Sequence, residues 1–216
     1  MTATEQRLRI PVGAVELDAD LIRPEPALGV VLFAHGSGSG RHSPRNRYVA
    51  AQLAECGLAT VLADMLTQAE ERVDLQTRHL RFDIDLLADR VIGLVDWLVA
   101  NESTTGLRVG VFGASTGAAA ALVAAAARPD EIASVVSRGG RADLAGRSLP
   151  LVRQPTLLVV GANDPVVIDL NRQAIEQLTG ETALEIVPGA SHLFEEPGTL
   201  ERVAALACDW FVRTLR

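Results

Sequence analysis

Residues 109–127 read VGVFGASTGAAAALVAAAA, and this stretch predicts a buried strand that turns directly into a helix. Its first residues are apolar or glycine, as expected of a strand covered on both faces. Its alanine-rich end is typical of a helix. Ser115 lies at the joint between Gly113 and Gly117, where a tight turn leaves little room for side chains. We expect this turn to project the serine from the carboxyl end of a sheet.

Short apolar runs alternate with longer helical stretches on both sides of this joint, which is typical of βαβ units. We therefore predict an α/β fold with a doubly wound, mostly parallel eight-stranded sheet that is flanked by helices and has no lid domain. The expected strands are 7–12, 14–22, 29–36, 58–65, 107–113, 132–137, 156–161 and 184–189, of which the first two form an antiparallel pair. The expected helices are 45–57, 79–100, 116–129, 167–179 and 199–215, with a short helix between 137 and 156 and a loop over 66–77.

The composition is that of one soluble α/β domain over residues 1–216, with no repeat or linker. Hydrophobic residues make up 48% of the chain, and the net charge is -7, which argues against nucleic acid and anionic membrane partners. No apolar run is long enough to span a membrane, and no signal peptide is visible, so we expect a reduced, cytoplasmic setting. Cys56 and Cys208 are interpreted as two separate small buried residues in helices.

All twenty basic residues are arginine, which excludes Schiff-base chemistry at a lysine. The missing lysine also excludes a phosphate-binding P-loop in the glycine-rich stretch 34–40. Histidines are few and are not grouped at metal-ligand spacing, so we expect neither a metal nor a cofactor. The four histidines are His35, His42, His79 and His192.

A nucleophilic serine needs a base and an acid that orients the base. His192 follows the last predicted strand, and Asp164 follows the strand before it. Loops at the carboxyl ends of parallel strands share one crevice, so we predict the triad Ser115, Asp164 and His192. The alternatives are that Asp164 only caps the next helix and that His192 is an ordinary loop histidine. Asp143 and Asp169 are weaker candidates for the acid.

An oxyanion hole needs two N–H groups close to the serine. One is the amide of Thr116, directly after Ser115. The other is expected in AHGSGSG, residues 34–40, with Ser37 as the first choice and Gly38 as the next. We call this stretch the oxyanion loop. We interpret His35 as a structural residue that holds this loop through its ring nitrogens.

Arginines near the same sheet edge are candidate contacts for an anionic group on a substrate. Arg138 and Arg141 flank two glycines after the sixth strand, and Arg81 begins the long helix. A guanidinium matches a carboxylate or phosphate in shape. The alternative is that these residues are solvated or pair with carboxylates such as Asp143. We expect Arg138 to be the main contact, if any of them binds an anion.

AHGSGSG, GASTG, GANDP and GASHLF follow the third, fifth, seventh and eighth predicted strands, and together they resemble the α/β-hydrolase fold over nearly the whole chain. The small size and the missing lid make the chain similar to the dienelactone hydrolase family, which hydrolyses lactones and esters. Typical members use a cysteine nucleophile and carry a glutamate near the oxyanion loop, whereas this chain has Ser115 and no glutamate in HGSGSG. The chain also resembles a hydrolase domain that is fused to phosphoribosyltransferases in some bacteria.

These observations predict a serine hydrolase that cleaves small carboxylic esters or lactones through an acyl-enzyme. Two alternatives stay open: a binding or regulatory module on the same scaffold, and an acyltransferase that uses the same triad. The expected partner is the small ester or lactone substrate, and a homodimer is left open.

Overall fold

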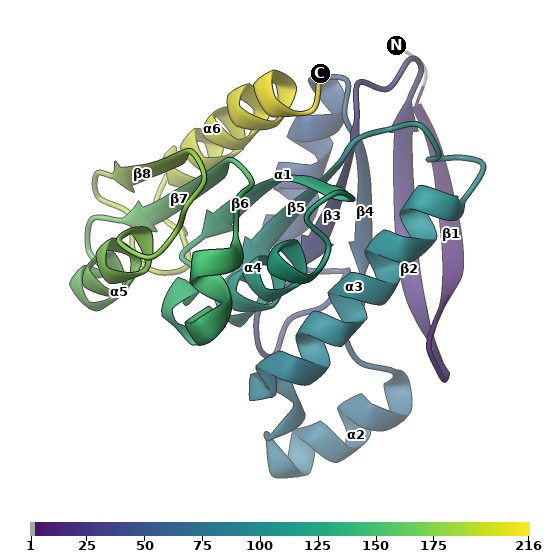
Figure 1. The fold of residues 1–216 in the computed structure, drawn as a ribbon, viewed down its shortest axis with the longest axis horizontal. Helices are drawn as coiled ribbons and strands as arrows, with labels where there is room; N and C mark the ends of the chain where they lie inside the picture. Colours follow the sequence, from purple (N-terminus) through teal and green to yellow (C-terminus); the bar gives the residue numbers. More distant parts are fainter. Residues whose placement is uncertain (1–2) are drawn as a thin grey trace.

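The computed structural model describes residues 3–216. An eight-stranded sheet forms its centre, as can be followed in Figure 1. The strands follow the order β1-β2-β4-β3-β5-β6-β7-β8. β2 is antiparallel to β1 and β4, and all other neighbours are parallel. The predicted doubly wound, mostly parallel sheet is confirmed, and no lid domain is evident between the described elements. The strands are β1 Ala3–Val12, β2 Val15–Pro24, β3 Val30–Ala34, β4 Ala59–Ala63, β5 Val109–Ala114, β6 Ile132–Arg138, β7 Thr156–Gly161 and β8 Thr182–Val187.

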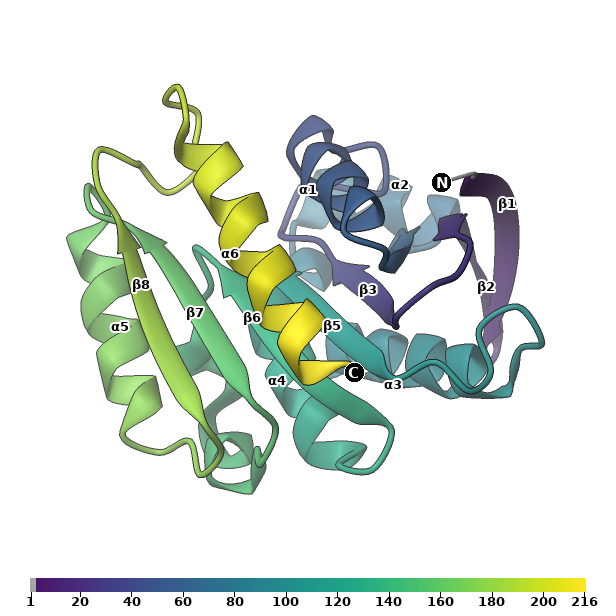
Figure 2. The ribbon, with the colours of Figure 1, turned by 90° about the horizontal axis from the view of Figure 1, so that it is seen from above.

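Helices cover both faces of this sheet (Figure 2). The central strands are buried on both sides, since β3, β4, β5 and β7 contain only buried residues. This explains why their sequences are continuous apolar runs rather than alternating patterns. The helices are α1 Pro44–Glu55 and α6 Thr199–Thr214 on one face, and α3 Ile84–Ala100, α4 Thr116–Ala127 and α5 Pro165–Ile175 on the other. The short predicted helix is the 3-10 segment η2, Ala142–Leu151, which packs against α4 and α5.

The prediction of a loop over 66–77 is wrong, because helix α2 spans Gln68–Thr77. Its first turn is closed by a capping box, in which the Thr67 hydroxyl accepts from the Glu70 amide and the Glu70 carboxylate accepts from the Thr67 amide. Only Asp74 is buried in this helix. A helix without an apolar face gives no hydrophobic periodicity, and this is why the sequence pattern did not indicate it.

The helix expected over 79–100 starts later than predicted. A 3-10 turn, η1, occupies Leu80–Phe82, and α3 begins at Ile84. The side chain of Asp83 caps α3 by accepting from the Leu86 amide at 3.0 Å.

Cys56 and Cys208 are joined by a disulfide, so the prediction of two separate buried cysteines is wrong. Cys56 ends α1 and Cys208 lies in α6, and the two helices pack side by side on the same face of the sheet. Their Cα atoms are 6.3 Å apart, a distance that a disulfide can span. Disulfides persist mainly in oxidising compartments, so this disulfide does not support the expected reduced, cytoplasmic setting, which stays a prediction.

Reduction of this disulfide should destabilise the fold, because the crosslinked residues are 152 positions apart in the chain. Opening a loop of this size should cost about 2–5 kcal/mol of unfolding free energy, since the unfolded chain regains entropy. Urea unfolding with and without reductant measures the difference. A Cys56→Ser/Cys208→Ser double variant is the control and should not respond to reductant. Equal unfolding midpoints for the oxidised and reduced wild type would contradict this expectation.

Candidate active site

Ser115 occupies the turn between β5 and α4 in a strained backbone conformation, with φ 50° and ψ -120°. Positive φ is uncommon outside glycine and is concentrated at functional sites. Hydrogen bonds hold the turn: the Ser115 amide donates to the carbonyl of Arg138 at 3.2 Å, and the Ser115 carbonyl accepts from the amides of Ala118 and Arg141. The serine is therefore fixed at the carboxyl edge of the sheet.

Three glycines let backbone segments approach this turn closely. A Cβ on Gly113 would lie 2.4 Å from the Cα of Ala118, and one on Gly117 would lie 2.2 Å from the carbonyl oxygen of Ala34. A Cβ on Gly36 would lie 2.9 Å from that of Ser115. All three distances are too short for a real side chain, so only glycine fits at these positions.

Asp164 and His192 are brought together as the sequence predicted. His192 Nδ1 lies 2.6 Å from Asp164 Oδ2, and the Asp164 side chain is largely shielded from solvent. Asp164 begins α5, but its side chain makes no capping hydrogen bond with this helix. The other candidate acids are engaged elsewhere, since Asp143 pairs with Arg141 and Asp169 pairs with Arg172.

The segment that carries His192 folds back over the end of β6. A Cβ on Gly139, directly after β6, would lie 3.6 Å from His192 Cε1. The Glu196 carboxylate accepts from the Ser191 amide at 3.0 Å, and this bond lowers the pKa of Glu196. Within residues 3–216, no hydrogen bond joins Ser115 to His192, although both lie at the same sheet edge.

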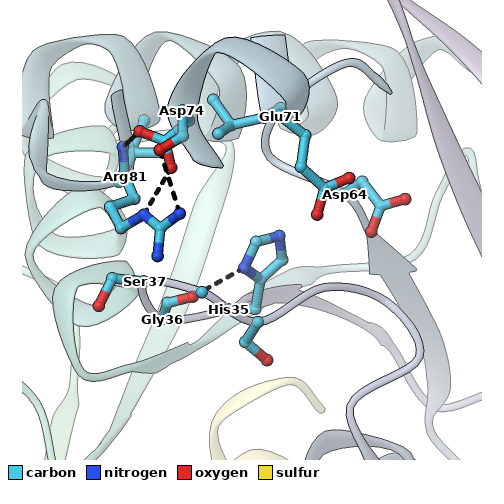
Figure 3. A pocket seen from close by; sticks show the side chains of 11 residues that line it. His35, Gly36, Ser37, Asp64, Glu71, Asp74 and Arg81 are labelled. Atoms are coloured by element: carbon cyan, nitrogen blue, oxygen red, sulfur yellow. Dashed lines mark hydrogen bonds and ion pairs between the residues drawn. The ribbon is translucent and has the colours of Figure 1, made fainter. Parts of the chain in front are cut away.

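The glycine-rich loop after β3 is held by His35, as expected (Figure 3). His35 Nδ1 lies 3.0 Å from the carbonyl oxygen of Gly36, and Nε2 lies 3.0 Å from the amide of Met65. The Met65 amide can only donate, so Nε2 is the acceptor and Nδ1 carries the hydrogen. Burial lowers the pKa of His35, which keeps the ring neutral. At the far end of the loop, the amide of Arg41 donates to Asp64 at 2.8 Å.

The two predicted oxyanion donors differ in the structure. The amide of Thr116 has no hydrogen-bond partner within the described residues, as expected at the first position of a helix. The amide of Ser37 is engaged, because it donates to the Thr116 hydroxyl oxygen at 3.1 Å. The oxyanion loop is thus tied directly to the residue after Ser115.

Arg81 and Gly38 meet at a small cavity of about 40 Å³ beside the oxyanion loop (Figure 3). The buried carboxylate of Asp74 accepts from Arg81 Nε at 2.5 Å and from the Arg81 amide at 3.1 Å. A Cβ on Gly38 would lie 3.3 Å from Arg81 Nη1. Sequence reasoning missed Asp74 because its helix was not recognised. The acidic residues on the cavity lining are Asp64, Glu71 and Asp74.

The two arginines after β6 have different surroundings. Arg141 makes two hydrogen bonds of 2.8 Å to Asp143, so its charge is neutralised. Arg138 is only 8% exposed, forms no ion pair with a described carboxylate, and leaves Nη1 without a hydrogen-bond partner in residues 3–216. Burial, with a further contribution from Arg45, lowers the pKa of Arg138 to about 10, which still leaves it charged at neutral pH.

Among residues 3–216, no group of three or more His, Cys, Asp or Glu residues is arranged to hold a metal ion. None of the helices in this described part of the chain is both long enough and apolar enough to cross a membrane.

The family model that matches is that of the dienelactone hydrolase family, over residues 17–216. The crystal structure of a dienelactone hydrolase from Anabaena variabilis ATCC 29413 is 58% identical, covers 99% of both chains and superimposes with a TM-score of 0.98. Est1E from Butyrivibrio proteoclasticus is 17% identical over 96% of this chain and 98% of its own, with a TM-score of 0.80, and shows likeness of fold alone.

Relatives in two Mycobacterium tuberculosis strains, CDC 1551 / Oshkosh and ATCC 25618 / H37Rv, are named as phosphoribosyl transferases. Each is 54% identical over 208 residues, which are 96% of this chain and 46% of the relative. The chain therefore spans about half the length of these relatives.

Acidification should destabilise the protein through His35. Because burial lowers the pKa of His35 in the folded state, the unfolded chain takes up the proton at a higher pH. The contribution of neutral His35 to the unfolding free energy is fully present above its ordinary pKa of 6.5. This contribution is lost as the pH falls from 6.5 through the folded-state pKa of His35. The loss should reach at most about 1.4 kcal/mol per pH unit, as measured by urea unfolding between about pH 7.5 and about pH 5.5.

Two asparagine variants separate this effect from general acid sensitivity. His35→Asn should flatten the pH dependence of the unfolding free energy. His79→Asn is the matched control and should keep the wild-type dependence, because His79 is exposed. The same pH dependence in His35→Asn and wild type would assign the acid sensitivity to other groups.

Proposed function

Because the chain belongs to the dienelactone hydrolase family, we propose that it is a serine hydrolase that cleaves small carboxylic esters or lactones. The observation that carries this proposal is the contact of 2.6 Å between His192 and Asp164 at the sheet edge where Ser115 is held in a strained turn. A serine, an imidazole and a carboxylate from three loops at one edge are the groups that nucleophilic acyl transfer needs.

In the proposed reaction, the Ser115 hydroxyl attacks the acyl carbon while His192 Nε2 takes its proton. The Asp164 carboxylate accepts a hydrogen bond from Nδ1–H and thereby fixes the tautomer that leaves Nε2 free as a base. His192 then returns the proton to the leaving alcohol. A water molecule, activated by the same imidazole, hydrolyses the acyl-enzyme and releases the acid.

Two other functions would use the same scaffold. A binding module would not need a nucleophile, and an acyltransferase would pass the acyl group to an alcohol instead of water. A fluorophosphonate probe that labels Ser115 would exclude the binding module. Product analysis in the presence of added alcohol would separate hydrolysis from acyl transfer.

We further propose that the preferred ester carries an anionic group that Arg138 recognises. Arg138 is the arginine near Ser115 whose charge no described carboxylate neutralises, and its carbonyl accepts from the Ser115 amide. Arg81 also faces the oxyanion loop, but Asp74 offsets its charge. Arg141 is the weakest of the three candidates because Asp143 engages its guanidinium with two hydrogen bonds.

Substitution of the proposed nucleophile should abolish turnover. Ser115→Ala should lower kcat by roughly 10³ or more on the best substrate from a panel of p-nitrophenyl esters, with the fold intact. Asp164→Asn should also be severe because it favours the wrong imidazole tautomer. Asp143→Asn is the matched control and should have little effect. Wild-type turnover in a folded Ser115→Ala variant would rule out the mechanism.

An anion site predicts that an ester with a free carboxylate has a higher kcat/KM than its methyl-capped analogue. A charge-assisted pair of about 2 kcal/mol corresponds to roughly a thirtyfold preference. Arg138→Met should remove the preference and leave the neutral ester nearly unchanged. Arg141→Met should keep it, because that guanidinium is already paired. If the wild type does not prefer the anionic ester, the role of Arg138 is wrong even where the triad is correct.

A further inference from the structure

The hydroxyl of Thr116 stands between the oxyanion loop and the nucleophile turn. Its oxygen accepts the hydrogen bond from the Ser37 amide at 3.1 Å, and the residue is only 4% exposed. Thr116 directly follows Ser115 and is the first residue of α4. The side chain therefore occupies the region in which the two predicted amide donors were expected to converge.

The hydrogen of this hydroxyl has no acceptor within residues 3–216. Threonines inside a helix commonly donate to the carbonyl one turn earlier, as Thr77 does to Val73 and Thr214 does to Trp210. Thr116 has no earlier helical turn, because strand β5 precedes it. A hydroxyl that accepts one bond can still donate another, so Thr116 holds a free donor beside Ser115.

The Ser37 amide, which donates to this hydroxyl, is held in place by the residue before it. The Gly36 carbonyl is held by His35, and the Gly36 backbone packs against the turn with no space for a Cβ. Figure 3 shows Ser37 directly beyond Gly36 on the same loop. Because the Ser37 amide is committed to the Thr116 oxygen, it is poorly placed to donate to a substrate at the same time.

We propose that the Thr116 hydroxyl donates a hydrogen bond to the oxyanion, alongside the amide of the same residue. The Ser37 amide then acts as a positioning group, which holds the hydroxyl oxygen and polarises its O–H bond. No covalent bond to Thr116 forms or breaks, and its proton stays on the hydroxyl throughout. This inference rests on the proposed serine hydrolase and adds a catalytic side chain to it.

Thr116→Val tests this role, because valine keeps the shape of threonine and removes the hydroxyl. Loss of one oxyanion donor typically lowers kcat by about 10²–10³, and KM should change little because the donor acts on the transition state. Thr116→Ser is the matched control, retains a hydroxyl and should keep kcat within about fivefold of wild type. Thr116→Ala provides a second hydroxyl-free variant if Thr116→Val does not fold.

A trifluoromethyl ketone supplies a readout that a purely structural role would not change. It forms a hemiketal oxyanion with the serine, so its Ki should rise in Thr116→Val by the same factor as kcat falls. Unchanged or higher kcat in Thr116→Val would overturn the inference, because it would mean that the freed Ser37 amide is the effective donor. Equal damage in Thr116→Ser and Thr116→Val would also overturn it.

Failure of the underlying function gives a different result. If the wild type hydrolyses no ester and a fluorophosphonate does not label Ser115, the serine hydrolase proposal itself is wrong. If the wild type is active and labelled while Thr116→Val remains fully active, only the role of the Thr116 hydroxyl is wrong.

Discussion

The close approach of three backbone segments around Ser115 is the constraint on which the candidate site depends. The oxyanion loop, the end of β5 and the start of α4 meet where Gly36, Gly113 and Gly117 leave no room for a Cβ. A larger residue at any of these positions would separate the segments. The free amide of Thr116, its hydroxyl and the Ser37 amide would then no longer share one region. The absence of side chains at these three glycines therefore fixes how the three backbone segments lie relative to one another, independently of the hydrogen bonds in the candidate site.

The parts of the site that follow from chain topology were predictable from the sequence. Buried parallel strands appear as continuous apolar runs, and the residue after each run lies at the carboxyl edge of the sheet. This places Asp164 and His192 at the edge that carries Ser115, although 28 residues separate the first two in the chain. Partners of flexible side chains do not follow from topology. The engagement of Ser37 by Thr116 could not be predicted. Pairing with Asp143 was an alternative for the arginines after β6, but the sequence did not indicate that Arg141 alone would form it.

Two elements escaped prediction because their stabilisation leaves no periodic signal. Helix α2 depends on its capping box and on the contact of Glu70 with Arg90 rather than on an apolar face. The pairing of Cys56 with Cys208 depends on α1 and α6 sharing one face of the sheet, which requires the complete strand order. The capping box of α2 is a local motif without hydrophobic periodicity, so a reading based on apolar spacing did not indicate the helix. The disulfide is a consequence of tertiary structure, and no local pattern contains it.

The disulfide also divides the chain mechanically. Ser115, Asp164 and His192 all lie between its two cysteines, whereas the oxyanion loop precedes Cys56. Tension applied to the chain outside the crosslink passes through the sulfur atoms and does not stretch the enclosed segment. A pulled molecule would lose the glycine-rich loop 34–40 first, while the covalently closed ring would still contain Ser115, Asp164 and His192.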